Sequence, residues 1–298
     1  MKTKRKPAFA TLRRGRQNLL AAALVGPLAL VSTSVRADDS AAMPTATLEA
    51  TPAAVPALAP ANAPNPDAWQ FGVTIPLWAP QIDGNTTTKG VQQDVHISFD
   101  QLKDHLDASF SMAVEVHKGK FGIYGDVGYM KFTGNPTAAN GDKADWDLKF
   151  LVSDAGMSYL LIKTESKHPF LLAGTLGVRY WYVDLDLKVK DSLGNVLLNG
   201  SSTKDLLDPM IGLRGSQYFT KKLHLDFAGD IGGFGFSDNQ AELDWSATGV
   251  VTYDFTKWFN LSAGYKALAV DASKGSGASK NGLDLVFHGA LIAANLKF

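Results

Sequence analysis

Apolar and polar residues alternate along most of residues 69–298. The clearest stretch is 243–255, where Leu243, Trp245 and Tyr253 share one parity and aspartate, serine and threonine occupy most of the other. Successive side chains of a β-strand point to opposite faces, so this pattern predicts a strand with one apolar and one polar face. The same alternation predicts further strands at 69–79, 108–117, 120–133, 146–161, 169–188, 204–219, 222–236, 257–270 and 283–298.

A membrane-spanning barrel explains this pattern better than a soluble sandwich, which also alternates. Trp245 and Tyr253 lie eight residues apart on one apolar face, which corresponds to roughly 20 Å along the membrane normal for a tilted strand. This distance suits two aromatic girdles around an apolar band roughly 25 Å tall. We therefore predict an all-β fold, a transmembrane up-and-down antiparallel β-barrel of about 10 strands, with about 12 or 8 as alternatives.

Residues 91–99 also alternate but do not fit this count. An eleventh spanning strand would give the odd number that an up-and-down barrel with both ends on one side cannot have. We therefore interpret 91–99 as part of a long excursion outside the membrane, with 98–107 forming a short helix or an ordered loop.

Two kinds of connection alternate along the predicted strands. Short links occur at 117–120, 219–222 and 255–258, with a slightly longer one at 162–169. Outer-membrane barrels have short periplasmic turns and long outer loops, so the C-terminus is expected on the periplasmic side. The longer polar links lie at 133–145, 191–203, 237–242 and 271–282.

The N-terminal part of the chain predicts export rather than folded structure. Residues 1–37 hold a basic cluster, an apolar stretch at 19–31 and small or apolar residues before Asp38, which is the pattern of a secretory signal peptide. Residues 38–68 carry six of the 13 prolines and predict a disordered, extended linker, expected to be periplasmic. The barrel is then expected to cover 69–298.

The charge of the whole chain is misleading. Its 29 basic and 29 acidic residues give a net charge of zero, but eight basic residues lie in 1–37. Without that segment 21 basic residues remain, for a net charge of −8, which argues against a nucleic-acid partner. The absence of cysteine excludes disulfides, cysteine-ligated metals and a cysteine nucleophile, and no cofactor is predicted.

Several strings in 69–298 are similar to a family of uncharacterised Gram-negative outer-membrane β-barrel proteins, loosely grouped with the small porin-like and OmpW- or OmpA-like barrels. The strings are IPLWA at 75–79, VHISFDQL at 95–102, EVHKGKFGIYGD at 115–126, GVRYW at 177–181, DPMIGLR at 208–214, GDIGGFG at 229–235 and GYK at 264–266. The resemblance implies location in the bacterial outer membrane, with contacts to its lipid and lipopolysaccharide, and implies no particular activity.

The last strand resembles the C-terminal signal of bacterial outer-membrane barrels. Ile292, Leu296 and Phe298 share one face, and Phe298 is the final residue. This resemblance implies recognition by the barrel-assembly machinery as a partner.

The polar strand faces predict a charged lumen. The candidate lumen network consists of Glu115, Asp126, Asp154, Arg179, Arg214, Asp226, Asp230 and Lys266, accompanied by Asp244, Asp254, His117 and His224. Charges in so narrow an interior must be paired or hydrated. Two interpretations follow: a structural barrel filled by ion pairs, or a narrow pore whose acidic excess favours cations and other small solutes.

Two other classes of function remain open at this point. An outer-membrane enzyme acting on lipid or peptide at the rim would need a histidine beside a carboxylate, and Asp94/His96 and His224/Asp226 are the candidate pairs. No catalytic motif or metal constellation accompanies them, so we predict no enzyme and no metal site. His288 is expected on the outward face near the outer rim. A soluble periplasmic ligand-binding barrel is the third alternative.

Overall fold

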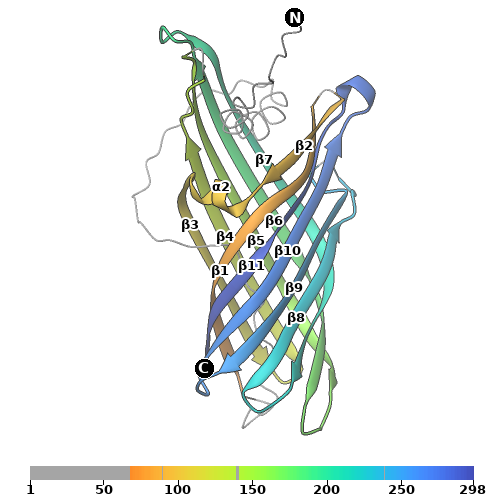
Figure 1. The fold of residues 1–298 in the computed structure, drawn as a ribbon. Helices are drawn as coiled ribbons and strands as arrows, with labels where there is room; N and C mark the ends of the chain where they lie inside the picture. Colours follow the sequence, from red (N-terminus) through yellow and green to blue (C-terminus); the bar gives the residue numbers. More distant parts are fainter. Residues whose placement is uncertain (1–67, 89, 139–140, 238) are drawn as a thin grey trace, which may run out of the picture.

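Ten antiparallel strands close into a barrel in residues 68–298 without 89, 139, 140 and 238, which are the residues that this computed structural model describes (Figure 1). The barrel strands are β1 (Gln70–Thr88), β3 (Leu106–Lys118), β4 (Phe121–Gly134), β5 (Lys143–Lys163), β6 (Phe170–Lys190), β7 (Val196–Tyr218), β8 (Leu223–Gly233), β9 (Leu243–Asp254), β10 (Phe259–Lys274) and β11 (Asn281–Lys297). Strands β3 to β11 follow one another around the wall, and β11 pairs back onto β1. The predicted all-β, up-and-down, ten-stranded barrel is confirmed. The predicted signal peptide and nearly all of the predicted linker lie outside the described residues.

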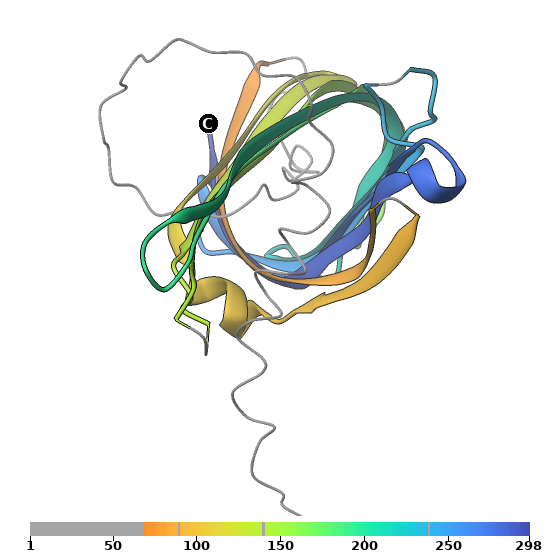
Figure 2. The same cartoon turned by 90° about the horizontal axis from the view of Figure 1, so that it is seen from above.

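Two further elements lie outside the ring of strands (Figure 2). Strand β2 (Val91–Ile97) pairs with the C-terminal part of β1, from Ile82 to Thr88. Helix α2 (Phe99–Lys103) connects β2 to β3. The backbone N–H of Ser98 donates to Oε1 of Gln101 at 2.9 Å, which caps the first turn of this short helix. The prediction that 91–99 is an excursion followed by a short helix is therefore confirmed.

The two ends of the barrel differ in their connections. We call the end at which β1 begins and β11 ends the terminal end, and the opposite end the loop end. At the terminal end β3 and β4 are joined by two residues, one of which is Gly119 with a φ of 60°. A left-handed residue of this kind suits glycine, because glycine has no Cβ to clash. At the loop end, a 3-10 turn, η1 (Gly277–Ser279), joins β10 to β11.

The strands extend farther toward the loop end than the sequence pattern indicated. The predicted link at 191–203 is wrong in its length, because β6 and β7 stay paired until Lys190 and Val196. Asp191 makes the short turn possible, since its side chain accepts hydrogen bonds from the backbone N–H groups of Leu193 and Asn195 at 2.9 and 2.8 Å. Strands β5, β6 and β7 have 21, 21 and 23 residues, about twice what a membrane crossing requires.

Candidate functional site

The outward wall is apolar near the terminal end and charged near the loop end. On β6 the outward side chains of Leu176 and Val178 are 59% and 42% exposed, and Asp184 and Lys188 follow on the same face. Lys149 Nζ lies 3.0 Å from Asp184 Oδ2 across the β5–β6 pair at this level. An exposed apolar band bounded by charges is what a spanning barrel presents to lipid.

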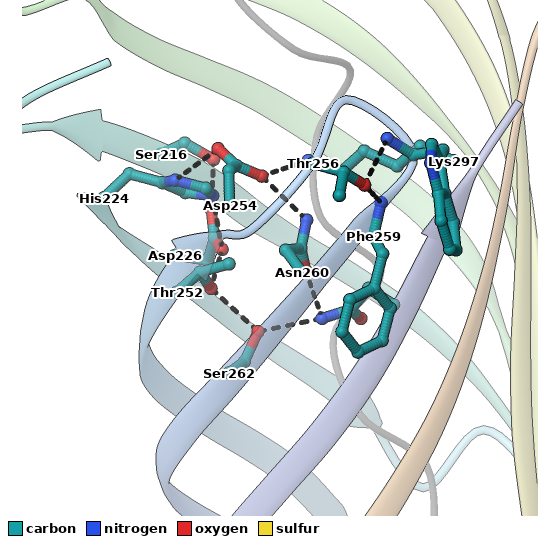
Figure 3. Close-up of polar contacts among 12 residues, drawn as sticks. Ser216, His224, Asp226, Thr252, Asp254, Thr256, Phe259, Asn260, Ser262 and Lys297 are labelled. Carbon is teal, nitrogen blue, oxygen red and sulfur yellow. Dashed lines mark hydrogen bonds and ion pairs between the residues drawn. The ribbon is translucent and has the colours of Figure 1, made fainter. Parts of the chain in front are cut away.

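A hydrogen-bonded network lines the lumen at the terminal end (Figure 3). The Asp226 carboxylate accepts hydrogen bonds from Ser216 Oγ at 2.5 Å and from Thr252 Oγ1 at 2.6 Å. Asn295 Nδ2 donates to Asn260 Oδ1 at 2.7 Å. The network continues across neighbouring strands through Thr74, His224, Asp254 and Ser262. These side chains come from β1 and from β7 to β11, so the network follows more than half of the wall.

A second contact crosses the lumen instead of following its wall. Arg214 on β7 forms an ion pair with Glu115 on β3, four strands away. The same guanidinium donates to Ser158 Oγ at 2.7 Å and lies 5.1 Å from the centre of the Tyr124 ring. His117 Nε2 is 2.6 Å from the Glu115 carboxylate. Arg214 therefore ties opposite sides of the barrel together.

Arg179 forms the next layer, closer to the middle of the barrel. Its guanidinium lies 2.8 Å from Asp154 Oδ2, 3.0 Å from Asp230 Oδ1 and 3.1 Å from Asp244 Oδ1, which are contributed by β5, β8 and β9. Trp181 donates its indole N–H to Asp244 Oδ2 at 3.2 Å. A planar guanidinium with several N–H groups suits this convergence of carboxylates.

Most charged groups of these two layers are almost completely buried. The side chains of Arg179, Asp244 and Glu115 are 1%, 0% and 1% exposed, and that of Arg214 is 4% exposed. The carboxylates of Asp154 and Asp230 are more accessible, at 11% and 18%. We call the two arginine layers together the charged floor.

An apolar cavity of about 650 Å³ lies in the lumen between the charged floor and the loop end. Trp181 belongs to both regions, because its ring lines the cavity while its N–H reaches Asp244. The rings of Phe150 and Phe287 stack with their centres 5.2 Å apart. Other lining side chains are Ile82, Val95, Leu102, Trp146, Leu148 and Leu206. Lys204, Glu242 and Lys274 contribute polar groups to the lining.

The cavity corrects the prediction that the inward face is polar along the whole strand. On β6 the inward residues after Arg179 are Trp181, Val183, Leu185 and Leu187, while the outward face becomes charged. The barrel wall therefore inverts: it is apolar outside and polar inside near the terminal end, and polar outside and apolar inside near the loop end. The prediction of a single lipid-facing side along each strand is therefore wrong near the loop end.

The predicted lumen residues all lie on inward faces. The charged floor contains Glu115, Asp154, Arg179, Arg214 and Asp230, and Asp226 belongs to the network at the terminal end. Asp126 is the register partner of Asp154, and Lys266 Nζ lies 5.8 Å from the centre of the Trp78 ring. The predicted assembly residues lie toward the terminal end of β11: Ile292 and Leu296 belong to the strand and Phe298 follows it. Ile292 and Phe298 are exposed.

A polar cluster on the outward wall was not predicted as a unit. Asp83 on β1 contacts His96 on β2 through one oxygen and His288 on β11 through the other, the latter at 2.8 Å. The hydrogen bond from His96 holds the pKa of Asp83 below its ordinary value of 3.8. Tyr265 Oη lies 2.6 Å from His288 Nδ1. The candidate pair Asp94/His96 therefore does not form, because β2 folds back onto β1 and turns His96 toward Asp83.

The other candidate catalytic pair is buried. His224 Nε2 lies 3.2 Å from Asp226 Oδ2, and both side chains are at most 3% exposed. In the described ranges no three histidine, aspartate or glutamate side chains are placed to hold a metal ion. Within the same residues, no helix has the length and apolar character to span a membrane.

The closed, tilted, antiparallel barrel with an outward apolar band defines the class of this chain as a β-barrel of the outer-membrane type. No family model matches the sequence, and no curated protein matches it. Solved structures similar in fold are outer-membrane barrels. The protease OmpT of Escherichia coli is 11% identical, covers 78% of this chain and 97% of its own, and has a TM-score of 0.49.

Two further solved structures are more distant. The translocator domain of the autotransporter NalP from Neisseria meningitidis is 14% identical, covers 77% of this chain and 88% of its own, and has a TM-score of 0.31. Ail of Yersinia pestis is 12% identical, covers 75% of this chain and 98% of its own, and has a TM-score of 0.29. These likenesses concern the fold and assign no activity to this chain.

Proposed function

We propose that this protein is an outer-membrane barrel that is closed along its axis and binds an apolar molecule in the cavity at its loop end. One observation carries the proposal: the charged floor lies directly below an apolar cavity. A pore for ions or small solutes needs a continuous hydrated path, and the nearly complete burial of Arg179, Asp244 and Arg214 supports a barrel without one at their level. Of the two interpretations of the lumen, the filled barrel therefore has the better support.

The cavity has the properties of a ligand site. Its volume of about 650 Å³ falls within the roughly 300–1,000 Å³ of small-molecule pockets, and its aromatic and aliphatic lining with a few polar groups is typical of them. Outer-membrane barrels have short periplasmic turns and longer outer loops, so the short turns at the terminal end support a periplasmic position for that end and an outer position for the loop end. The cavity would then receive its ligand from the outer side of the membrane.

The proposed role is binding without catalysis. Ser216 and Thr252 donate to Asp226 at the terminal end, and the buried His224 ring lies beside the carboxylates of Asp226 and Asp254, far along the barrel from the cavity. The cluster around Asp83 lies on the outward wall, where it links β1, β2 and β11. Each group thus has a structural role that accounts for its placement.

Planar-bilayer recording tests the closed floor. We expect the purified, refolded wild-type protein to insert without producing discrete conductance steps, while a general diffusion porin in the same bilayers produces them. In the double variant Glu115→Ala and Arg214→Ala, which removes both partners of the cross-lumen ion pair, we expect at most small conductance. Reproducible steps from the wild-type protein would show an open axis and would refute the proposal.

A further inference from the structure

The barrel wall contains a seam between β1 and β3. These strands pair from Gln70↔His117 to Thr74↔Ala113, and β1 resumes pairing on that side only at Ile82, with β2. Residues 75–81 of β1 therefore have no strand partner on the side that faces β3. Elsewhere around the described barrel, neighbouring strands stay paired over much longer runs.

Two prolines explain why the seam forms at this place. Phe71 exchanges backbone hydrogen bonds with Phe298, so the odd residues of β1 direct their N–H groups toward β11. The even residues direct theirs toward β3, and Pro76 and Pro80 lie at even positions in the unpaired stretch. Because proline has no N–H, this edge of β1 lacks two donors that a ladder with β3 would use.

Helix α2 connects β2 to β3 at the loop-end side of the seam, and Figure 2 shows that it lies outside the ring of strands. The helix contacts β1. Its residue Leu102 is 6% exposed and lines the cavity, whereas Phe99 is 39% exposed. Pro80 and Ile82 on β1 line the cavity as well. A single turn of helix thus separates the cavity from the outside of the wall.

The outside of the seam belongs to the apolar band. Ile75 and Leu77 on β1 are 50% and 58% exposed, and Phe110 and Met112 on the facing stretch of β3 are 38% and 37% exposed. An apolar surface therefore continues from the band, past α2, to the lining of the cavity. Such continuity suits a molecule that is already dissolved in the membrane.

We infer that the cavity takes the hydrocarbon chain of a single-chain amphiphile, which enters sideways from the outer membrane leaflet through the seam beneath α2. The inference rests on the proposed function, since it requires a barrel that spans the membrane and is closed below the cavity. A long flexible chain suits the apolar lining and passes a narrow opening that a folded or branched molecule would not. Lys204 and Lys274 outnumber Glu242 in the lining, so its charged side chains favour an anionic head group.

Tryptophan quenching by a stearic acid with two bromine atoms on its chain tests the binding. Trp69, Trp245 and Trp258 lie on the outward side of the wall, so replacing each of them with phenylalanine leaves Trp78, Trp146 and Trp181, which are buried in the lumen. In vesicles containing this variant we expect saturable quenching at one probe per protein.

A matched pair of substitutions on β6 locates the probe. Val183 lines the cavity and Val178 is exposed on the outward face of the same strand. Val183→Phe is expected to weaken binding at least tenfold, and Val178→Phe to leave it within twofold. If the parent variant shows no saturable quenching, or if both substitutions act equally, the binding inference is wrong, whereas bilayer recordings without steps would still support the closed floor.

A reducible cross-link across the seam tests whether the ligand enters there. Because the chain has no cysteine, Leu77→Cys on β1 and Phe110→Cys on β3 place the only two thiols on opposite sides of the seam at exposed positions, where a short thiol cross-linker can join them. Cross-linking with a reducible reagent is expected to slow uptake from vesicles at least tenfold without changing the final occupancy, and reduction is expected to restore the rate. An unchanged rate in the cross-linked protein would contradict entry through the seam.

Discussion

Replacing Arg179 with alanine is expected to destabilise the barrel by about 3–5 kcal/mol, the cost of leaving buried charges without their partner. Three carboxylates, from Asp154, Asp230 and Asp244, converge on this one guanidinium. Without it they would repel one another in a region from which solvent is nearly excluded. The expected result is a lower midpoint of urea unfolding in detergent and a lower temperature for the loss of heat-modifiable migration on gels.

Lys149→Ala is the matched control for Arg179→Ala. Lys149 also forms an ion pair between neighbouring elements, with Asp184, but its side chain is 36% exposed on the outward wall near the loop end. Exposed pairs contribute about 0–1 kcal/mol, so this variant is expected to unfold nearly as the wild-type protein does. Equal effects of the two substitutions would show that the carboxylates around Arg179 are hydrated, and would contradict the charged floor.

Gly264→Ala is expected to cost about 1–3 kcal/mol and to slow folding into micelles, because the wall at this position has no room for a methyl group. A Cβ on Gly264 would overlap the carbonyl oxygen of Gly249 and would lie 2.6 Å from Cα of Val250. Both contacts are with backbone atoms of β9, so no side-chain rotation relieves them. The two strands would have to separate locally.

The neighbouring glycine supplies the control for this substitution. A Cβ on Gly249 would meet nothing within 4 Å, so Gly249→Ala is expected to leave the unfolding midpoint unchanged or to raise it slightly, since alanine restricts the unfolded chain more than glycine does. Far-ultraviolet circular dichroism and gel migration after refolding compare the two variants directly. If Gly264→Ala refolds as completely as Gly249→Ala, the close approach of β9 and β10 is not a constraint on the wall.

Alternation was sufficient to predict the barrel, its approximate strands and the inward position of the charged residues. It was also sufficient, in principle, to predict the cavity. Leu185 and Leu187 share the parity of Arg179, while Asp186 and Lys188 share the parity of the lipid-facing Val178. A change of parity along one strand means that the strand leaves the membrane and continues in water, where the apolar face turns inward.

The contacts across the lumen could not be predicted in the same way. Arg214 and Glu115 are 99 positions apart and four strands apart around the wall, so their meeting depends on strand tilt and stagger, which alternation does not report. The partner of His96 depends on the register of β2 against β1, where Asp83↔His96 is one of seven aligned pairs. Pro76 and Pro80 did carry a readable signal, because two prolines of one parity mark an edge that cannot be fully paired.

The central claim is that the charged floor divides the lumen into a closed part and a cavity open toward the loop end. The absence of cysteine allows a direct measurement: the rate at which a charged, water-soluble maleimide labels single-cysteine variants in detergent. Leu206 lines the cavity, and Thr248 lies inward on β9 on the terminal side of Asp244 with 7% exposure. The account predicts rapid labelling of Leu206→Cys and labelling of Thr248→Cys only after unfolding in urea. Comparable labelling rates in the two folded variants would show a hydrated passage through the barrel and would contradict the account.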